Sequence, residues 1–186
     1  MKFDPISLAF AAVLSMTGNA PAQQLDNRQI IDSLGELQGA APAVDLALLN
    51  EELNAHLGQG VAQLPHWSTL ATLPQFAVEV DFENDSIAIE PSSYRNVGVI
   101  ADALHYPRLL PYRFLVVGHS SATGGAEHNL KLSAERAKAI ADALTTTFGV
   151  APQRIYSLGV GQEWPIDAAD PGAAANRRVQ LINLGP

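Results

Sequence analysis

Residues that could do chemistry gather between His119 and Arg136, in a segment with the sequence HSSATGGAEHNLKLSAER. His119 next to Ser120 and Ser121 places a base beside hydroxyl nucleophiles, a combination that serine hydrolases use. Neighbours in sequence rarely form such a catalytic set, and the sequence has no Gly-x-Ser-x-Gly turn to expose a serine between a strand and a helix. We therefore expect that the chain is not an enzyme.

Two other kinds of site can be assessed by residue spacing. His119, Glu127 and His128 could ligate a metal ion, but their spacing matches no known ligand pattern. Residues 159–161 are Gly-Val-Gly, like the start of a dinucleotide-binding fingerprint, but Trp164 stands where the third glycine would be. The sequence therefore predicts neither a metal nor a cofactor.

A strand, a loop and a helix are predicted to position the polar residues of this segment. The apolar run Phe114–Val117 stops at Gly118-His119, and a polar turn with two glycines follows. Apolar residues then recur at helical spacing from Leu130 to Phe148. The turn therefore lies at the carboxyl end of a buried strand, where open α/β sheets commonly bind ligands.

Two blocks of this sequence resemble the signature of OmpA-like peptidoglycan-binding domains. In that family the strand ends in Gly-His-Thr-Asp, with a Gly three residues later, then an Asn, a Leu-Ser pair and an Arg-Ala pair. At the same spacing this chain has Gly118-His119-Ser120-Ser121, Gly124, Asn129, Leu132-Ser133 and Arg136-Ala137. The second family block, Asn-Arg-Arg-Val, is found at residues 176–179. The departure from the pattern is Ser121, which replaces the Asp.

The resemblance implies a pocket for the diaminopimelate of the peptidoglycan stem peptide. That ligand is a zwitterion, so the family supplies an Arg for its carboxylate and an Asp for its ammonium. The corresponding positions here are Arg136, whose guanidinium suits a two-point contact, and Ser121. Asn129 lies two helical turns before Arg136 on the same face. Arg178 completes the expected ligand-binding set, because at most one of the neighbouring Arg177 and Arg178 would face the pocket if they alternate on a strand.

Ser121 separates two hypotheses about function. A hydroxyl accepts a weaker hydrogen bond than a carboxylate, so binding is expected to be weaker by about one to two orders of magnitude. Glu127 or Glu163 could supply the missing charge. The first hypothesis is a module that binds peptidoglycan non-covalently. The alternative is an OmpA-fold protein-interaction module with lost or altered peptidoglycan affinity.

The N-terminus has the pattern of a secretory signal peptide. Lys2 precedes an 11-residue apolar run, Ile6–Met16, and Ala20-Pro21-Ala22 gives a small-x-small cleavage site before Gln23. That run is too short for a bilayer core, which needs roughly 20 residues. The chain contains no cysteine that could carry a lipid. We therefore expect a periplasmic protein, with an association with the outer membrane as a further expectation.

Composition narrows the class of partner. The net charge is −8, with 11 basic and 19 acidic residues, which disfavours nucleic acid because nucleic-acid binding needs a basic surface. Peptidoglycan is the expected partner. Two apolar stripes, Ile30–Leu37 and Leu46–Leu57, predict short helices ahead of the family-like region. These helices are either a packed extension or a docking arm for an outer-membrane or other envelope protein.

The chain divides into three predicted segments: signal peptide 1–22, helical extension and linker 23–75, and OmpA-like domain 76–186. The linker, residues 58–74, carries one helical turn around Trp67. The domain is expected to be α/β with the order β-α-β-α-β-β. Its predicted strands are Phe76–Phe82, Phe114–Val117, Arg154–Leu158 and Arg177–Asn183, with helices after Pro91 and after the 120–125 turn. The resemblance implies a mixed four-stranded sheet with helices on one side.

Overall fold

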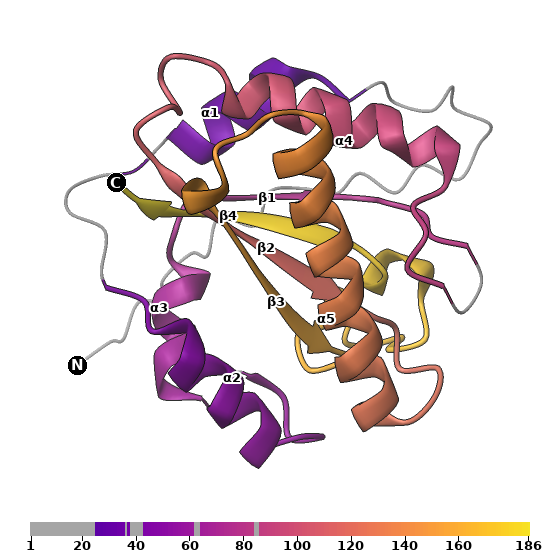
Figure 1. Cartoon of the computed structure of the whole chain (residues 1–186). Helices are drawn as coiled ribbons and strands as arrows, with labels where there is room; N and C mark the ends of the chain where they lie inside the picture. The colour runs from indigo at the N-terminus through magenta and orange to yellow at the C-terminus, as the bar shows by residue number, and fades with distance from the viewer. Residues whose placement is uncertain (1–24, 36, 38–42, 62–63, 84–85) are drawn as a thin grey trace, which may run out of the picture.

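The structure is a computed structural model that describes residues 25–35, 37, 43–61, 64–83 and 86–186. The expected signal peptide, residues 1–22, lies outside the described residues. Within them the chain forms one four-stranded sheet with helices packed against it (Figure 1). No helix in this part of the chain is both long and apolar enough to span a membrane.

The sheet is mixed and has the strand order β1-β4-β2-β3. Its strands are β1 (Gln75–Val78), β2 (Arg113–His119), β3 (Ile155–Gly161) and β4 (Val179–Gly185). The two central strands β4 and β2 are antiparallel, β1 is antiparallel to β4, and β3 is parallel to β2. The predicted fold class, a mixed four-stranded α/β sheet, is confirmed.

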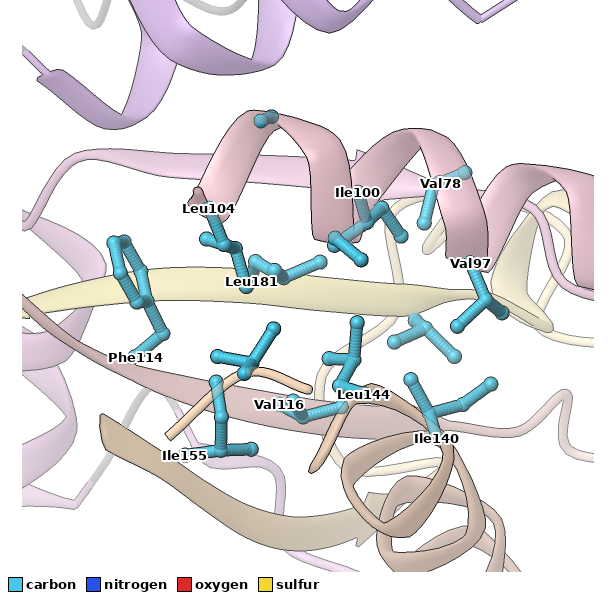
Figure 2. Close-up of a cluster of buried hydrophobic side chains, with 14 of the residues drawn as sticks. Val78, Val97, Ile100, Leu104, Phe114, Val116, Ile140, Leu144, Ile155 and Leu181 are labelled. Atoms are coloured by element: carbon cyan, nitrogen blue, oxygen red, sulfur yellow. The ribbon is translucent and has the colours of Figure 1, made fainter. Parts of the chain in front are cut away.

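One face of the sheet is covered by α1 (Asn27–Gly35), α4 (Pro91–Leu104) and α5 (Ala126–Asp142). Side chains alternate along a strand, so Phe114 and Val116 of β2 point to this face. Figure 2 shows them beneath Ile100 and Leu104 of α4 and beside Leu181 of β4. All five of these residues are completely buried. This core holds the two long helices that follow β1 and β2.

The opposite face of the sheet is covered by the N-terminal helices α2 (Leu46–Ala55) and α3 (Pro65–Ala71). Leu115 and Val117 of β2 point to this side and pack against them. Trp67 of α3 is 2% exposed. The α4 and α5 helices therefore lie on one side as the resemblance implies. Of the extension, α1 joins them on that side, and α2 and α3 add a second layer on the other.

Several predicted elements differ in extent from the observed ones. Strands β2 and β3 run further than predicted, to His119 and Gly161. Strand β1 ends at Val78, and Phe82 makes only an isolated bridge to Ile89, because the backbone at Asp81 bonds instead to Ser93 and Glu90 at the start of α4. The predicted linker contains α3, which begins at a proline, a residue suited to the first helical position. Strand β4 starts two residues later than expected, after a 3₁₀ turn at Ala174–Asn176.

Helix α5 approaches the backbones of β2 and β3 closely at Gly118 and Gly159. A Cβ atom added at Gly118 would lie 2.2 Å from the Ser133 carbonyl oxygen, and one at Gly159 would lie 2.2 Å from the Ala134 nitrogen. The Ser133 hydroxyl donates to the Leu130 carbonyl and accepts the Gly161 N–H, both at 2.8 Å. The glycines therefore set the distance between the helix and the sheet.

This contact predicts a large effect of adding a single methyl group. Gly159→Ala should lower the free energy of unfolding by about 2 kcal/mol or more, because the helix must move to admit the Cβ atom. Gly172→Ala is the matched control, since its Cβ would meet only ordinary contacts of 3.4 Å and beyond, and its effect should stay within about 0.5 kcal/mol. Urea unfolding measures both, and equal losses in the two variants would contradict the close-packing account.

Candidate functional site

A cleft of about 200 Å³ opens at one edge of the sheet. Strands β1 and β2 are each antiparallel to β4, so the ends of β1 and β2 meet the start of β4 at this edge. Helix α5 borders the same cleft through Arg136. The lining residues from the strand ends and their loops are Glu79, Val80, Asp81, Phe82, Gly118, His119, Ala174, Arg177, Arg178 and Val179.

Arg136 reaches from α5 to the segment that follows β1. Its Nε donates a hydrogen bond to the Ser86 carbonyl at 3.1 Å, and its guanidinium carbon lies 4.8 Å from the centre of the Phe82 ring. A planar guanidinium over an aromatic ring is attracted by the ring's negative face. The side chain is therefore held at the cleft wall by two contacts and is not an ordinary solvated arginine.

Arg178 is the most deeply buried of the cleft arginines. The residue is 8% exposed, and its Nη2 donates a hydrogen bond to the Trp164 carbonyl at 3.1 Å. Its Nη1 is buried and has no hydrogen-bond partner among the described residues. Burial lowers the pKa of Arg178 to about 10, so the group stays charged at neutral pH. Arg178 is therefore a charged group at the cleft with one donor unpaired among the described residues.

Arg177 lines the cleft together with Arg178. The expectation that at most one of them faces the pocket is therefore wrong. It assumed that both residues alternate on a strand, but β4 begins only at Val179 and Arg177 follows directly on the 3₁₀ turn. Arg177 is exposed, and its Nη1 lies 3.5 Å from the Ser121 hydroxyl, where it can donate a long hydrogen bond.

Ser121 and Asn129 lie behind the cleft and are not among the residues that line it. Ser121 is 2% exposed, and its hydroxyl is 3.0 Å from that of Thr123. The Asn129 amide donates to the Ser121 carbonyl at 3.2 Å and to the Gln162 side chain at 2.8 Å. Of the four predicted site residues, the structure thus brings Arg136 and Arg178 to the cleft, while Asn129 ties the Ser121 turn to the β3–β4 loop.

The carboxylates of the cleft are Glu79 and Asp81. Glu163, one of the two acids proposed to replace the family's Asp, is 5% exposed and accepts hydrogen bonds from backbone N–H groups of the N-terminal extension. Glu127, the other, is exposed and does not line the cleft. In the sequence, Glu79 and Asp81 alternate with apolar residues along the predicted strand Phe76–Phe82, and this acidic outer face is the signal by which they could have been found.

His119 lies at the base of the cleft and is held neutral. Burial lowers its pKa well below 6.5, and the adjacent charge of Arg178 lowers it further, although the Gln180 side chain and Trp164 backbone nearby oppose this slightly. Neither ring nitrogen makes a well-formed hydrogen bond to the described residues. Among the residues that the structure describes, no three His, Cys, Asp or Glu side chains are arranged to hold a metal ion.

Arginines and carboxylates line a cleft at one edge of a mixed sheet, and sequence comparison identifies the family of this domain. The sequence model of the OmpA family matches residues 81–178, which is more than half of the chain. The chain belongs to the OmpA family. The matched segment contains Asp81, Arg136 and Arg178 of the cleft.

Two relatives illustrate the range of proteins in which this domain occurs. Outer membrane porin F of Pseudomonas fluorescens is 34% identical over 114 residues, 60% of this chain and 34% of that protein. The peptidoglycan-binding protein ArfA of Mycobacterium bovis is 36% identical over 106 residues, 55% of this chain and 31% of that protein. The chain thus matches about a third of the length of each.

Solved structures agree on the fold. The periplasmic domain of Helicobacter pylori MotB, residues 97–256, superposes with a TM-score of 0.51 at 22% identity. The superposition covers 60% of this chain and 81% of the MotB domain. At this identity the match establishes a common fold for the two chains.

The neutral His119 predicts a specific loss of stability in acid. The unfolded chain has a histidine pKa near 6.5, whereas the folded pKa is lower, so below pH 6.5 the unfolded state binds more protons. The free energy of unfolding should therefore fall as pH drops below 6.5, by at most about 1.4 kcal/mol per pH unit from this group. Urea unfolding of wild type and His119→Gln from pH 7.5 to 5.5 should show a flatter pH dependence in the variant. Parallel curves would contradict the assignment.

Proposed function

We propose that this chain binds peptidoglycan non-covalently through the cleft. The observation that carries the proposal is the set of charges around it: Arg136, Arg177 and Arg178 together with Glu79 and Asp81. The guanidinium groups suit a ligand carboxylate, and the carboxylates can accept hydrogen bonds from an ammonium. Diaminopimelate in the stem peptide presents both groups, which is the ligand chemistry that the family resemblance implies.

Membership in the OmpA family supports this proposal, as does the similarity to ArfA, a peptidoglycan-binding protein. In the cell envelope the chain would attach to the wall from the periplasm, in association with the outer membrane. The N-terminal pattern of a secretory signal is consistent with that location.

A second function, a protein-interaction module without wall affinity, is favoured by one observation. Ser121 replaces the family's Asp and is buried away from the cleft, so it offers a ligand no charge. However, the apolar stripe of α2 is already used: Leu49 and Leu53 are each 1% exposed and pack against the sheet. A protein partner of the extension would therefore contact its outer polar faces. Deleting the extension would expose the apolar residues on the sheet face that α2 and α3 cover.

Arg136 provides the direct test of the proposed function. Arg136→Ala should reduce co-sedimentation with purified sacculi to background, because a bound carboxylate would lose its two-point contact. Arg136→Lys should restore binding only in part, since an ammonium cannot reproduce that contact. Arg95→Ala is the control, because Arg95 is exposed on α4 away from the cleft and its loss changes the net charge equally. Wild-type protein that does not sediment at low salt would rule the proposal out in favour of the interaction module.

The acids of the cleft distinguish specific ligand binding from simple charge attraction, because the two predict opposite changes in affinity when the acids are neutralised. Glu79→Gln with Asp81→Asn should weaken sacculus binding roughly tenfold, because the ligand ammonium would lose a charged acceptor. Non-specific attraction to an anionic polymer would instead strengthen when two negative charges are removed. Unchanged binding in the double variant would show that these acids do not contact the ligand.

A further inference from the structure

The N-terminal extension is connected to the cleft through Glu163, in the loop between β3 and β4. One carboxylate oxygen of Glu163 accepts the Gly58 N–H and the other accepts the Gly60 N–H, each at 2.9 Å. Its backbone carbonyl accepts the Val61 N–H at 3.1 Å. Three hydrogen bonds therefore join this residue to the α2–α3 connection, about 100 residues earlier in the chain.

The connection is shaped to present these donors. Gly58 and Gly60 have φ angles of 84° and 77°, in the left-handed region that glycine enters without strain. This conformation turns two N–H groups of one short segment toward a single carboxylate. Glu163 is 5% exposed, so its negative charge is compensated by these backbone donors and not by solvent.

The residue after Glu163 continues the link to the cleft. The Trp164 ring packs edge-on against Trp67 of α3, with 5.4 Å between ring centres, and lies 5.8 Å from the His119 ring. The Trp164 carbonyl accepts the hydrogen bond from Arg178 Nη2. Nη1 has no partner among the described residues. The orientation of the guanidinium therefore depends on the position of the Trp164 carbonyl.

We infer that Glu163 is a positioning residue for the cleft: by fastening the extension to the β3–β4 loop, it fixes the Trp164 carbonyl that orients Arg178. The part that concerns affinity rests on the proposed function, because it requires a ligand in the cleft. The part that concerns the orientation of Arg178 holds for the unliganded protein. The extension would thus contribute to ligand binding without contacting the ligand.

The test compares Glu163→Gln with Glu52→Gln. The first keeps the size of the side chain but puts an amide donor opposite one backbone N–H. The second removes another carboxylate of the extension, which bonds His66 of α3 at 2.5 Å and lies outside the cleft and the β3–β4 loop. Both variants should lose some stability in urea. Glu163→Asp, which keeps the charge but shortens the reach, is used in the same way if Glu163→Gln does not fold.

The first measurement needs no ligand. The side-chain ¹⁵N resonance of Arg178, assigned by its loss in Arg178→Lys, should shift in Glu163→Gln and stay in place in Glu52→Gln. An unchanged resonance in Glu163→Gln would overturn the inference. This result is independent of whether the wild type binds sacculi, so failure of the proposed function and failure of the positioning role can be told apart.

The second measurement is the sacculus-binding isotherm. Glu163→Gln should weaken binding roughly five- to tenfold, a coupling at the lower end of that between connected sites, while Glu52→Gln should bind like the wild type. In an Arg178→Lys background the Glu163→Gln change should have little further effect, because its path to the ligand is already broken. A full additional loss in that background would show a purely structural role and overturn the inference.

Discussion

The arrangement of the cleft depends on the close approach of α5 to the ends of β2 and β3. Gly118 and Gly159 allow backbone to meet backbone there, and Ser133 bonds the Gly161 N–H across the contact. Since α5 carries both Asn129 and Arg136, this one distance sets where the turn is tied down and where the guanidinium reaches the cleft wall. A methyl group at the contact would displace all of these groups together.

Arg154 and Arg178 show how differently two arginine side chains can be satisfied by the fold. Arg154 is partly buried, which lowers its pKa, and it donates to the carbonyls of Leu104, Leu109 and Tyr112 while stacking on Phe114. It ties the end of α4 to the start of β3. Arg178 has one carbonyl partner and one buried nitrogen without a partner among the described residues. Because an unsatisfied buried donor is destabilising, such a group fits a site that a ligand completes.

The N-terminal extension covers the second face of the sheet with helices α2 and α3. The OmpA family model begins at residue 81, after α2 and α3, yet these helices bury Leu115 and Val117 of β2. A sheet covered on both faces keeps both sets of alternating side chains apolar, as residues Phe114–Val117 of β2 do here. The extension is therefore part of the folded unit that holds the cleft, and its bonds to Glu163 bring it close to the arginines of the cleft.

The sequence alone determined the features that depend on local order. Periodicity and glycine placement located the sheet strands and the two long helices, and motif spacing selected Arg136 and Arg178, which both reach the cleft. Only the tertiary structure decided which acids join them. Glu79 and Asp81 line the cleft because β1 ends early and pairs with β4, whereas Glu163 is taken by the extension. Such outcomes depend on pairing between segments far apart in the chain. Spacing along one segment carries no information about which distant backbone groups will form hydrogen bonds with a side chain.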